Sequence, residues 1–234
     1  MTDSSESDLE SVRAIAKSYF DDHEHPFPAH DWHHVQRVET LAERLAADRS
    51  VDDRVLGLAV LLHDIGRGRE DVGEIDDHAA WGAKEARRIL SGSNTFGNSE
   101  GDRNRTTDLE VTDATIDAVA HCIRAHRYSN DVEPTTPEAR LLSDADNLDA
   151  LGAIGIARVF SYGGEAGTAI HDPAVPIERD DSRAGATSVN HIYKKILELP
   201  DRMYTDEGRA LAADRKRAVV DFVDRLEAEV AGER

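Results

Sequence analysis

A run of apolar residues that ends in a histidine and an aspartate constrains this chain more than any other feature. The eight residues from Val55 to Leu62 are seven aliphatic side chains and one glycine, and His63 and Asp64 follow them directly. Such a run is expected in the interior, where an ionised carboxylate costs roughly several kcal/mol unless a cation or hydrogen-bond donors compensate it. The pair is therefore a candidate metal site, provided that further ligands occur elsewhere in the chain.

The spacing of apolar residues predicts an all-α fold. After Asp31, which can cap a helix, apolar residues recur every three or four positions from Val35 to Leu45. No segment shows the alternation of a β-strand, and no internal repeat is visible. Gly66 offers a stop for the helix that carries His63. Similar patterns predict helices at residues 9–19, 31–45, 51–63, 78–90, 115–126, 137–160, 189–199 and 207–230.

The length of 234 residues suits one large domain or two small ones. Nothing in the composition marks a boundary, so we expect a single domain over residues 1–234, with a core at about 7–160 and a C-terminal helical extension at 187–230. Residues 91–108 are rich in Ser, Gly, Asn and Thr and are expected to form a mobile surface loop. Residues 161–187 contain two prolines and adjacent glycines and are expected to form a second mobile loop.

The composition excludes several classes of function. A net charge of −19 argues against nucleic-acid binding, which requires a basic face. No segment approaches the roughly 20 apolar residues of a membrane span, and no signal peptide is visible, so we expect a cytoplasmic protein without a membrane partner. Cys122 is the only cysteine, which excludes an internal disulfide and a zinc site with several thiolates.

Lysine is scarce in this acidic chain, with five residues among the 28 basic ones. An acidic surface with little lysine resembles proteins of salt-loving archaea, in which high salt screens the repulsion between like charges. An ordinary acidic cytosolic protein also fits this composition. The charge pattern therefore predicts either a halophilic protein or an acidic protein of the cytosol.

Three predicted helices can supply metal ligands together. His34 shares a helix face with the apolar residues four, seven and eleven positions further on, and Asp146 lies four residues after a leucine and four before an alanine. With His63 and Asp64 they make a set of two imidazoles and two carboxylates. This set suits manganese, iron, nickel, cobalt or magnesium better than a structural zinc, and it leaves positions for water and substrate. Water bound to such an ion becomes a nucleophile near neutral pH, and phosphate esters or anhydrides are its natural targets.

The order of these four residues, His34, then His63-Asp64, then Asp146, resembles the H…HD…D signature of the HD-domain superfamily of metal-dependent phosphohydrolases. The short sequence motifs around these residues resemble those of the small stand-alone HD hydrolases, some of which are nucleoside triphosphate pyrophosphohydrolases. The resemblance implies a helical HD bundle and the four ligands named above, with Asp146 favoured over Asp144 as the ligand. The matching motifs are His-Asp-Trp at 30–32, Leu-Leu-His-Asp-Ile-Gly-Arg at 61–67, His-Arg-Tyr-Ser at 126–129 and Asp-Ala-Asp-Asn-Leu-Asp-Ala-Leu-Gly at 144–152.

Two further histidines and an arginine complete the candidate site. Some HD proteins with a similar arrangement hold a second metal with two additional histidines, and others use such groups on substrate phosphates. His78 and His126 therefore have three open roles: a second ion, contact with the substrate or leaving group as a general acid, or structural hydrogen bonding. Asp64 either accepts the proton of the attacking water as well as binding the ion, or only binds the ion. Arg67 is a candidate for bidentate bonding to phosphate oxygens.

The sequence thus predicts a metal-dependent phosphohydrolase that acts on a nucleotide or another small phosphorylated metabolite. Cleavage of a nucleoside triphosphate to monophosphate and pyrophosphate is the leading version. A phosphomonoesterase or a cyclic-nucleotide phosphodiesterase would use the same residues. The alternative from another class is a non-catalytic regulatory module that binds a metal and a nucleotide. The sequence predicts no oligomeric state.

Overall fold

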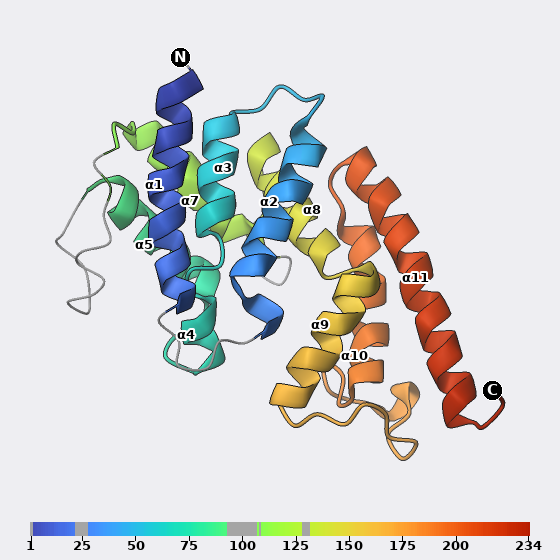
Figure 1. The fold of residues 1–234 in the computed structure, drawn as a ribbon. Coiled ribbons are helices and arrows are strands. Elements are labelled where there is room, and N and C mark those ends of the chain that lie inside the picture. Colours follow the sequence, from blue (N-terminus) through green and yellow to red (C-terminus); the bar gives the residue numbers. More distant parts are fainter. Residues whose placement is uncertain (1, 22–27, 93–106, 108, 128–131) are drawn as a thin grey trace. The chain divides into compact units, whose positions relative to one another are not determined.

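A computed structural model describes residues 2–21, 28–92, 107, 109–127 and 132–234 of the chain. Within these residues the regular structure is helical, and one isolated parallel bridge joins Ala169 to Thr187 (Figure 1). This confirms the predicted all-α fold. None of the described helices has both the length and the apolarity needed to cross a membrane. The predicted loop at 91–108 falls almost entirely outside the described residues.

The described residues form two compact units, one within residues 2–21 and 30–143 and the other within residues 28–29 and 144–234. The expectation of a single domain over the whole chain stays a prediction. A 3-10 helix, η1 (Pro28–His30), and the helix α8 (Pro137–Asp149) each contribute residues to both units. The first unit also contains α1 (Thr2–Asp21), α2 (Trp32–Ala46), α3 (Asp53–Leu62), α4 (Arg67–Asp71), α5 (His78–Leu90) and α7 (Asp113–Ala125).

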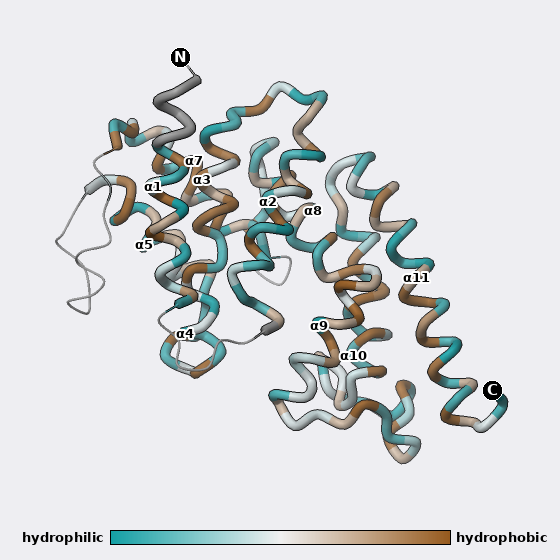
Figure 2. Tube along the Cα trace, in the orientation of Figure 1, coloured by the Kyte–Doolittle hydropathy of each residue, from teal (hydrophilic) through white to brown (hydrophobic). Residues whose placement is uncertain are grey.

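Helix α3 is the centre of the first unit. It packs against α1, α2 and α7, and Figure 1 shows it between α1 and α2. Asp52 caps its first turn by accepting hydrogen bonds from the backbone N–H groups of Arg54 and Val55. Its residues from Val55 onward are buried except Gly57, and most of the helix has the brown of hydrophobic residues in Figure 2. The apolar run is therefore the core of this unit, as the sequence predicts.

A close approach of two helices explains the glycine inside this apolar run. A Cβ atom on Gly57 would lie 3.1 Å from a methyl carbon of Leu9 on α1. The missing side chain lets α1 pack directly on the backbone of α3, and Leu9 fills the space. The predicted apolar stripe of α2 is also confirmed, because its residues from Val35 to Leu45 on that face are buried.

The second unit is helical and its core lies between three helices. Helix α9 packs on α10 and α11, and the 3-10 helix η3 packs on α10 and α11 as well. Three buried side chains of α11, Ala212, Val219 and Val223, form its inner face. The elements after α8 are α9 (Gly152–Glu165), η2 (Ile177–Arg179), α10 (Ser188–Lys194), η3 (Ile196–Arg202) and α11 (Asp206–Val230).

The single helix predicted at residues 137–160 is wrong, because the chain breaks between α8 and α9. Gly152 has a φ of +70°, a backbone conformation that a side chain disfavours and that ends helical propagation. A Cβ on Gly155 would lie 2.2 Å from the carbonyl oxygen of Ala150, so a tight turn forms only with glycine there. The apolar period runs through this break, which is why the spacing alone predicts one helix.

The other differences lie in the connections of the second unit. Helix α9 continues to Glu165, five residues into the irregular segment expected at 161–187, and the remainder of that segment contains η2. Its mobility stays a prediction. The helix predicted at 189–199 is divided into α10 and η3, and Pro200 lies inside η3. Because a proline has no N–H to donate, an α-helix does not continue through residue 200.

Candidate metal centre

His34 and His63 lie side by side in the core of the first unit. Asp31 accepts a hydrogen bond of 2.9 Å from the backbone N–H of His34 and so fixes the first turn of α2, where His34 lies. His63 directly follows the last residue of α3 and keeps a helical backbone, with φ −62°. The Nε2 atoms of His34 and His63 are 3.3 Å apart, and both side chains are fully buried.

Asp64 begins the turn after α3 and places its carboxylate between two pairs of imidazoles. Its Oδ2 lies 3.5 Å from Nε2 of His34 and 3.9 Å from Nε2 of His63. Its Oδ1 lies 3.2 Å from Nε2 of His78 and 3.7 Å from Nε2 of His126. No member of this cluster is more than 4% exposed. Five residues predicted as site residues from the sequence are thus brought together in one unit.

The start of α5 and the end of α7 supply the second imidazole pair. His78 is the first residue of α5 and His126 directly follows α7, and their Nε2 atoms are 3.4 Å apart. Asp77 caps α5 and also accepts a hydrogen bond of 2.7 Å from Arg124 of α7. This link holds the two helix ends together, so that both histidines face Asp64.

Hydrogen bonds at the outer nitrogen fix the orientation of three of the four rings. Nδ1 of His63 donates to the carbonyl oxygen of Val60 at 2.7 Å, and Nδ1 of His126 donates to the carbonyl oxygen of Ile123 at 2.6 Å. Nδ1 of His78 donates to a carboxylate oxygen of Glu70. A donor at Nδ1 leaves Nε2 available as a ligand atom, which is the usual arrangement of histidines in metal sites.

The buried groups of the cluster shift the pKa values of one another. Burial alone would raise the pKa of Asp64, but the His63 imidazole and hydrogen bonds from the other three rings outweigh it and hold that pKa well below its usual range. Burial lowers the pKa of His78, yet its hydrogen bonds to Asp64 and Glu70 raise the pKa to about 9. The carboxylate is therefore ionised and needs positive charge beside it.

The donor set fits a divalent cation. Asp64, His78 and His126 each offer one ligand atom, and these atoms lie within 4.8 Å of one another. Neutral imidazoles and a carboxylate suit first-row divalent metals, and a cation would supply the charge that the buried carboxylate requires. The fit extends to the pair formed by His34 and His63, whose Nε2 atoms face the other oxygen of Asp64.

Helix α4 carries Arg67, which the sequence predicts as a site residue, and Glu70, which it does not. Glu70 contacts His78, and Arg67 forms an ion pair of 2.7 Å with Asp71 through Nη2. Arg67, predicted as a phosphate ligand, is thus engaged with a carboxylate of its own helix, and its phosphate contact stays a prediction. Burial and the repulsion of nearby carboxylates raise the pKa of Asp71 despite this ion pair. Helix α4 is only five residues long and four of them are charged, so it has no apolar spacing from which a helix could be predicted.

Gly66 has a different role from the helix stop that the sequence suggests. Helix α3 already ends at Leu62, and Gly66 has an ordinary φ of −94°. A Cβ atom on Gly66 would lie 2.8 Å from the Trp81 ring and 3.0 Å from the carbonyl oxygen of His78. Glycine is therefore needed for space, because the turn after Asp64 passes directly over the start of α5.

The remaining predicted ligand, Asp146, lies in α8 and belongs to the second unit. It is half-buried, and its role as a ligand stays a prediction. Its neighbours have other partners in that unit. Asp144 accepts hydrogen bonds from the backbone N–H groups of Tyr204 and Thr205 and from the Thr205 hydroxyl, and so caps α11 indirectly. Asp149 forms an ion pair of 2.9 Å with Arg158.

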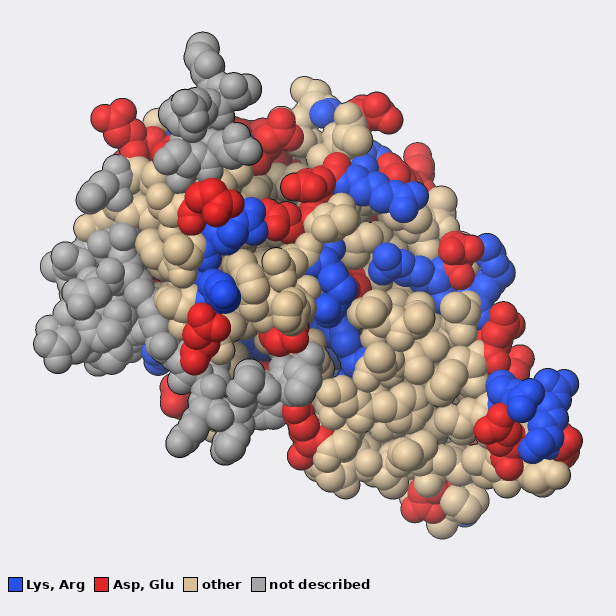
Figure 3. All heavy atoms as spheres, viewed as in Figure 1, with Lys and Arg blue, Asp and Glu red and all other residues tan. Residues whose placement is uncertain are grey.

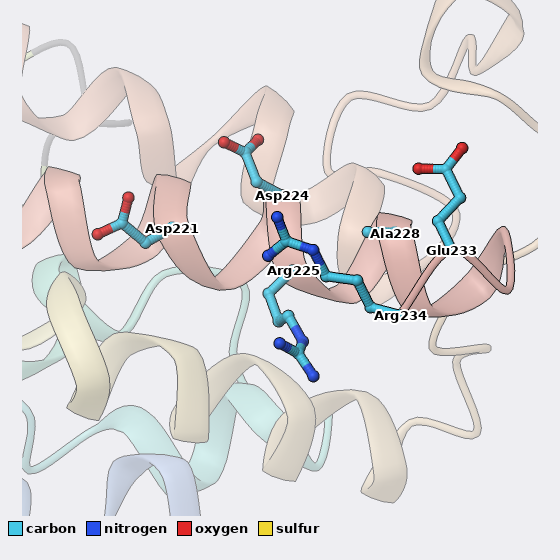
Figure 4. Close-up of a pocket in the computed structure, with 6 residues that line it drawn as sticks. All are labelled: Asp221, Asp224, Arg225, Ala228, Glu233 and Arg234. Carbon is cyan, nitrogen blue, oxygen red and sulfur yellow. The ribbon is translucent and has the colours of Figure 1, made fainter.

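The surface of the second unit offers one further pocket. It lies on the last turns of α11 and the residues after them (Figure 4). Its side chains are charged apart from one alanine, and none is an imidazole or an aromatic ring. Along the same helix, arginines pair with acidic residues one turn away, Arg217 with Asp214 and Arg225 with Glu229. Figure 3 shows acidic and basic groups adjoining on this surface. The pocket is lined by Asp221, Asp224, Arg225, Ala228, Glu233 and Arg234.

These observations define a helical protein with a buried histidine–aspartate cluster that can hold a divalent metal ion. A family model of the HD domain matches residues 31–151, which is more than half of the chain. The chain belongs to the HD domain family. His34, His63, Asp64, His78 and His126 all lie within the matched residues, and so does Asp146.

Similar proteins span nearly the whole chain. YpgQ of Bacillus subtilis is 29% identical over 229 residues, which are 95% of this chain and 94% of that protein. A solved structure from Lactobacillus plantarum has a TM-score of 0.73 at 29% identity, and an HD-superfamily hydrolase from Bacillus thuringiensis has 0.70 at 29%. Each comparison covers 97% of this chain and 98% of the other. YpgQ in complex with ADP has a TM-score of 0.66 at 27% identity, over 96% of this chain and 98% of that one.

Proposed function

We propose that this protein is a metal-dependent phosphohydrolase whose substrate is a nucleotide. The observation that carries the proposal is the placement of the Asp64 carboxylate between four buried imidazoles, whose Nε2 atoms lie 3.2–3.9 Å from its two oxygens. The similarity to an HD-superfamily hydrolase supports hydrolysis as the reaction class. The ADP complex of YpgQ supports a nucleotide as the ligand.

In this proposal His34, His63, Asp64 and Asp146 hold a divalent ion, which is manganese, cobalt, nickel, iron or magnesium. When bound, such an ion lowers the pKa of coordinated water and neutralises charge on a phosphate group. The burial of the cluster excludes bulk water, which strengthens every charge interaction inside it. Asp64 would either accept the proton of the attacking water as well as bind the ion, or only bind the ion; its lowered pKa favours metal binding, since an ionised carboxylate is the ligand form.

His78 and His126 would act on the other side of Asp64. As a general acid, His78 would donate the proton of Nε2, which lies 3.2 Å from Oδ1 of Asp64, to a leaving oxygen. If a second ion occupies this pair instead, both rings are ligands through Nε2. Arg67 would contact phosphate oxygens if its ion pair with Asp71 opens.

For a nucleoside triphosphate, attack of water on the α-phosphorus breaks the bond to the bridging oxygen and gives a monophosphate and pyrophosphate. The experiment supplies a panel of nucleoside triphosphates, monophosphates and cyclic nucleotides with each of the five cations, at low and high salt, and identifies the products. Monophosphate and pyrophosphate are expected. Inorganic phosphate from monophosphates would favour a phosphomonoesterase, and ring opening of cyclic nucleotides would favour a phosphodiesterase.

Two variants make the test specific to the cluster. Asp64→Asn removes the charge that all four imidazoles face and is expected to lower kcat/KM at least about 100-fold. His33→Gln is the matched control, because His33 neighbours His34 but is exposed. Nucleotide binding without turnover by any cation would overturn the enzyme and leave the regulatory module as the function.

A further inference from the structure

Glu70 accepts four hydrogen bonds, two from His78 at the start of α5 and two from Arg127. Its Oε2 accepts from the backbone N–H of His78 at 2.9 Å and from Nδ1 of the His78 ring. Nη1 of Arg127 donates to Oε1 of Glu70 at 2.9 Å and to Oε2 at 3.3 Å. The side chain of Glu70 is 18% exposed, so these bonds are partly shielded from water. One carboxylate thus fixes both the backbone and the ring of His78.

His78 differs from the other oriented imidazoles in the kind of acceptor at Nδ1. His63 and His126 donate to neutral backbone carbonyls three residues earlier, whereas His78 donates to a carboxylate eight residues away in the sequence. A hydrogen bond to an ionised acceptor is stronger than one to a carbonyl and makes the ring more basic. The position of His78 therefore depends on a side chain outside its own helix.

Charged contacts within α4 and with Arg127, two residues after α7, surround Glu70, and Nη1 of Arg67 itself lies 3.7 Å from Oε1 of Glu70. Arg67 binds Asp71 through Nη2 at 2.7 Å and Nε at 3.3 Å, and Asp71 is almost completely buried at its carboxylate. Arg127, at the end of α7, binds Glu70. Since His126 is the residue before Arg127, the same carboxylate links both members of the second imidazole pair.

We propose that Glu70 is a positioning residue that orients His78, so that Nε2 of this ring faces Oδ1 of Asp64. The effect of Glu70 on the reaction rests on the proposed function. The side chain acts through His78 and does not touch the substrate. Residues of this kind change metal affinity or activity by about 10–100-fold when they are removed.

The test uses two readouts on four variants. Glu70→Ala removes the acceptor, and Glu70→Gln keeps its shape without the charge. Arg127→Gln removes the two hydrogen bonds from Arg127 and leaves those from His78. Glu74→Gln is the matched control, because Glu74 follows α4 on the same turn, is exposed and pairs with Arg69. Circular dichroism verifies that each variant folds.

The first readout is the Nδ1–H signal of His78 in metal-free protein with 15N-labelled histidine, assigned by its loss in His78→Ala. We expect this downfield signal in the wild type and in Glu74→Gln, a shift in Glu70→Gln, and its loss in Glu70→Ala. An unchanged signal in Glu70→Ala would overturn the proposal. This readout needs no activity, so it decides whether Glu70 holds the ring even if the protein hydrolyses no nucleotide.

The second readout is a double-mutant cycle on kcat/KM. We expect Glu70→Ala to lower kcat/KM by about 10–100-fold in the wild type and by less than about twofold when His78 is already alanine. We expect Arg127→Gln to have a smaller effect than Glu70→Ala. An equal loss in both backgrounds would show that Glu70 acts independently of His78, and it would refute the positioning role.

Discussion

Adding one methyl group at Gly66 should damage the site, although Gly66 carries no chemistry. A Cβ there would lie 2.8 Å from Cε3 of Trp81, 3.0 Å from the carbonyl oxygen of His78 and 3.3 Å from Cα of His78. The φ of −94° is comfortable for alanine, so the backbone conformation itself adds no strain. The whole effect of Gly66→Ala must come from displacing Trp81 and the start of α5.

The expected magnitude follows from these distances. Overpacking a tight core costs about 1–3 kcal/mol, which for a chain of this size lowers Tm by roughly 2–12 °C. Because His78 is the residue that must move, its Nε2 should leave its 3.2 Å contact with Asp64. A misplacement of about 1 Å can cost on the order of 100-fold in rate, so kcat/KM should fall by about 10–100-fold.

Gly82→Ala on α5 is the matched control. A Cβ on Gly82 would meet Ile123 at 3.5 Å and the carbonyl oxygen of His63 at 3.6 Å, which are ordinary contacts. Replacing a helical glycine by alanine should leave the free energy of unfolding unchanged or raise it by up to about 1 kcal/mol, so Tm should not fall. Calorimetry gives Tm and nucleotide hydrolysis gives kcat/KM. If the two variants behave alike in both assays, the packing argument for Gly66 is refuted.

Three further predictions concern charge and hydrogen bonding. A divalent cation at 100 times its Kd should stabilise the wild type by about 2.7 kcal/mol and so raise Tm. Asp64→Asn should abolish this rise in Tm, and His33→Gln should keep it. Equal rises in the two variants would contradict a metal at Asp64. The pKa of His78 is raised to about 9, so the stability from its proton is complete below an unfolded pKa of about 6.5 and is lost as the pH rises through 9. Since a cation must displace that proton, metal affinity measured by calorimetry should rise from pH 7 to 9, and a flat profile would refute this. Thr205→Val removes the hydroxyl that donates to Asp144 at 2.6 Å. The free energy of unfolding, measured in urea, should fall by about 1–3 kcal/mol. An unchanged free energy would show that this hydrogen bond does not stabilise the fold.

Much of the fold and the site could be predicted from the sequence. The apolar run at 55–62 gives the central helix, and the polar pair His63-Asp64 at its end gives the centre of the cluster. His34 is predicted from the face it shares with apolar residues. These inferences succeed because they depend on local spacing, which a helix converts directly into position in space.

The parts that were missed depend on contacts between distant segments. Glu70 becomes important only because a turn brings α4 beside the start of α5, and four charges in five residues conceal that helix. The sequence predicts a helix stop at Gly66, whereas the contact with Trp81 shows that glycine is needed there for space. The helix break at Gly152 depends on a positive φ, and the spacing of apolar residues carries no information about that angle.

The location of a bound cation tests the central claim most directly. Crystals soaked with Mn²⁺ give an anomalous signal that marks each ion, and this matters in a chain with 47 acidic residues, where weak surface sites are expected. We predict a peak at bonding distance, about 2.0–2.2 Å, from the Asp64 carboxylate and from histidine Nε2 atoms of the cluster, and its loss in Asp64→Asn. Peaks on surface carboxylates alone, with none at Asp64, would contradict the metal centre.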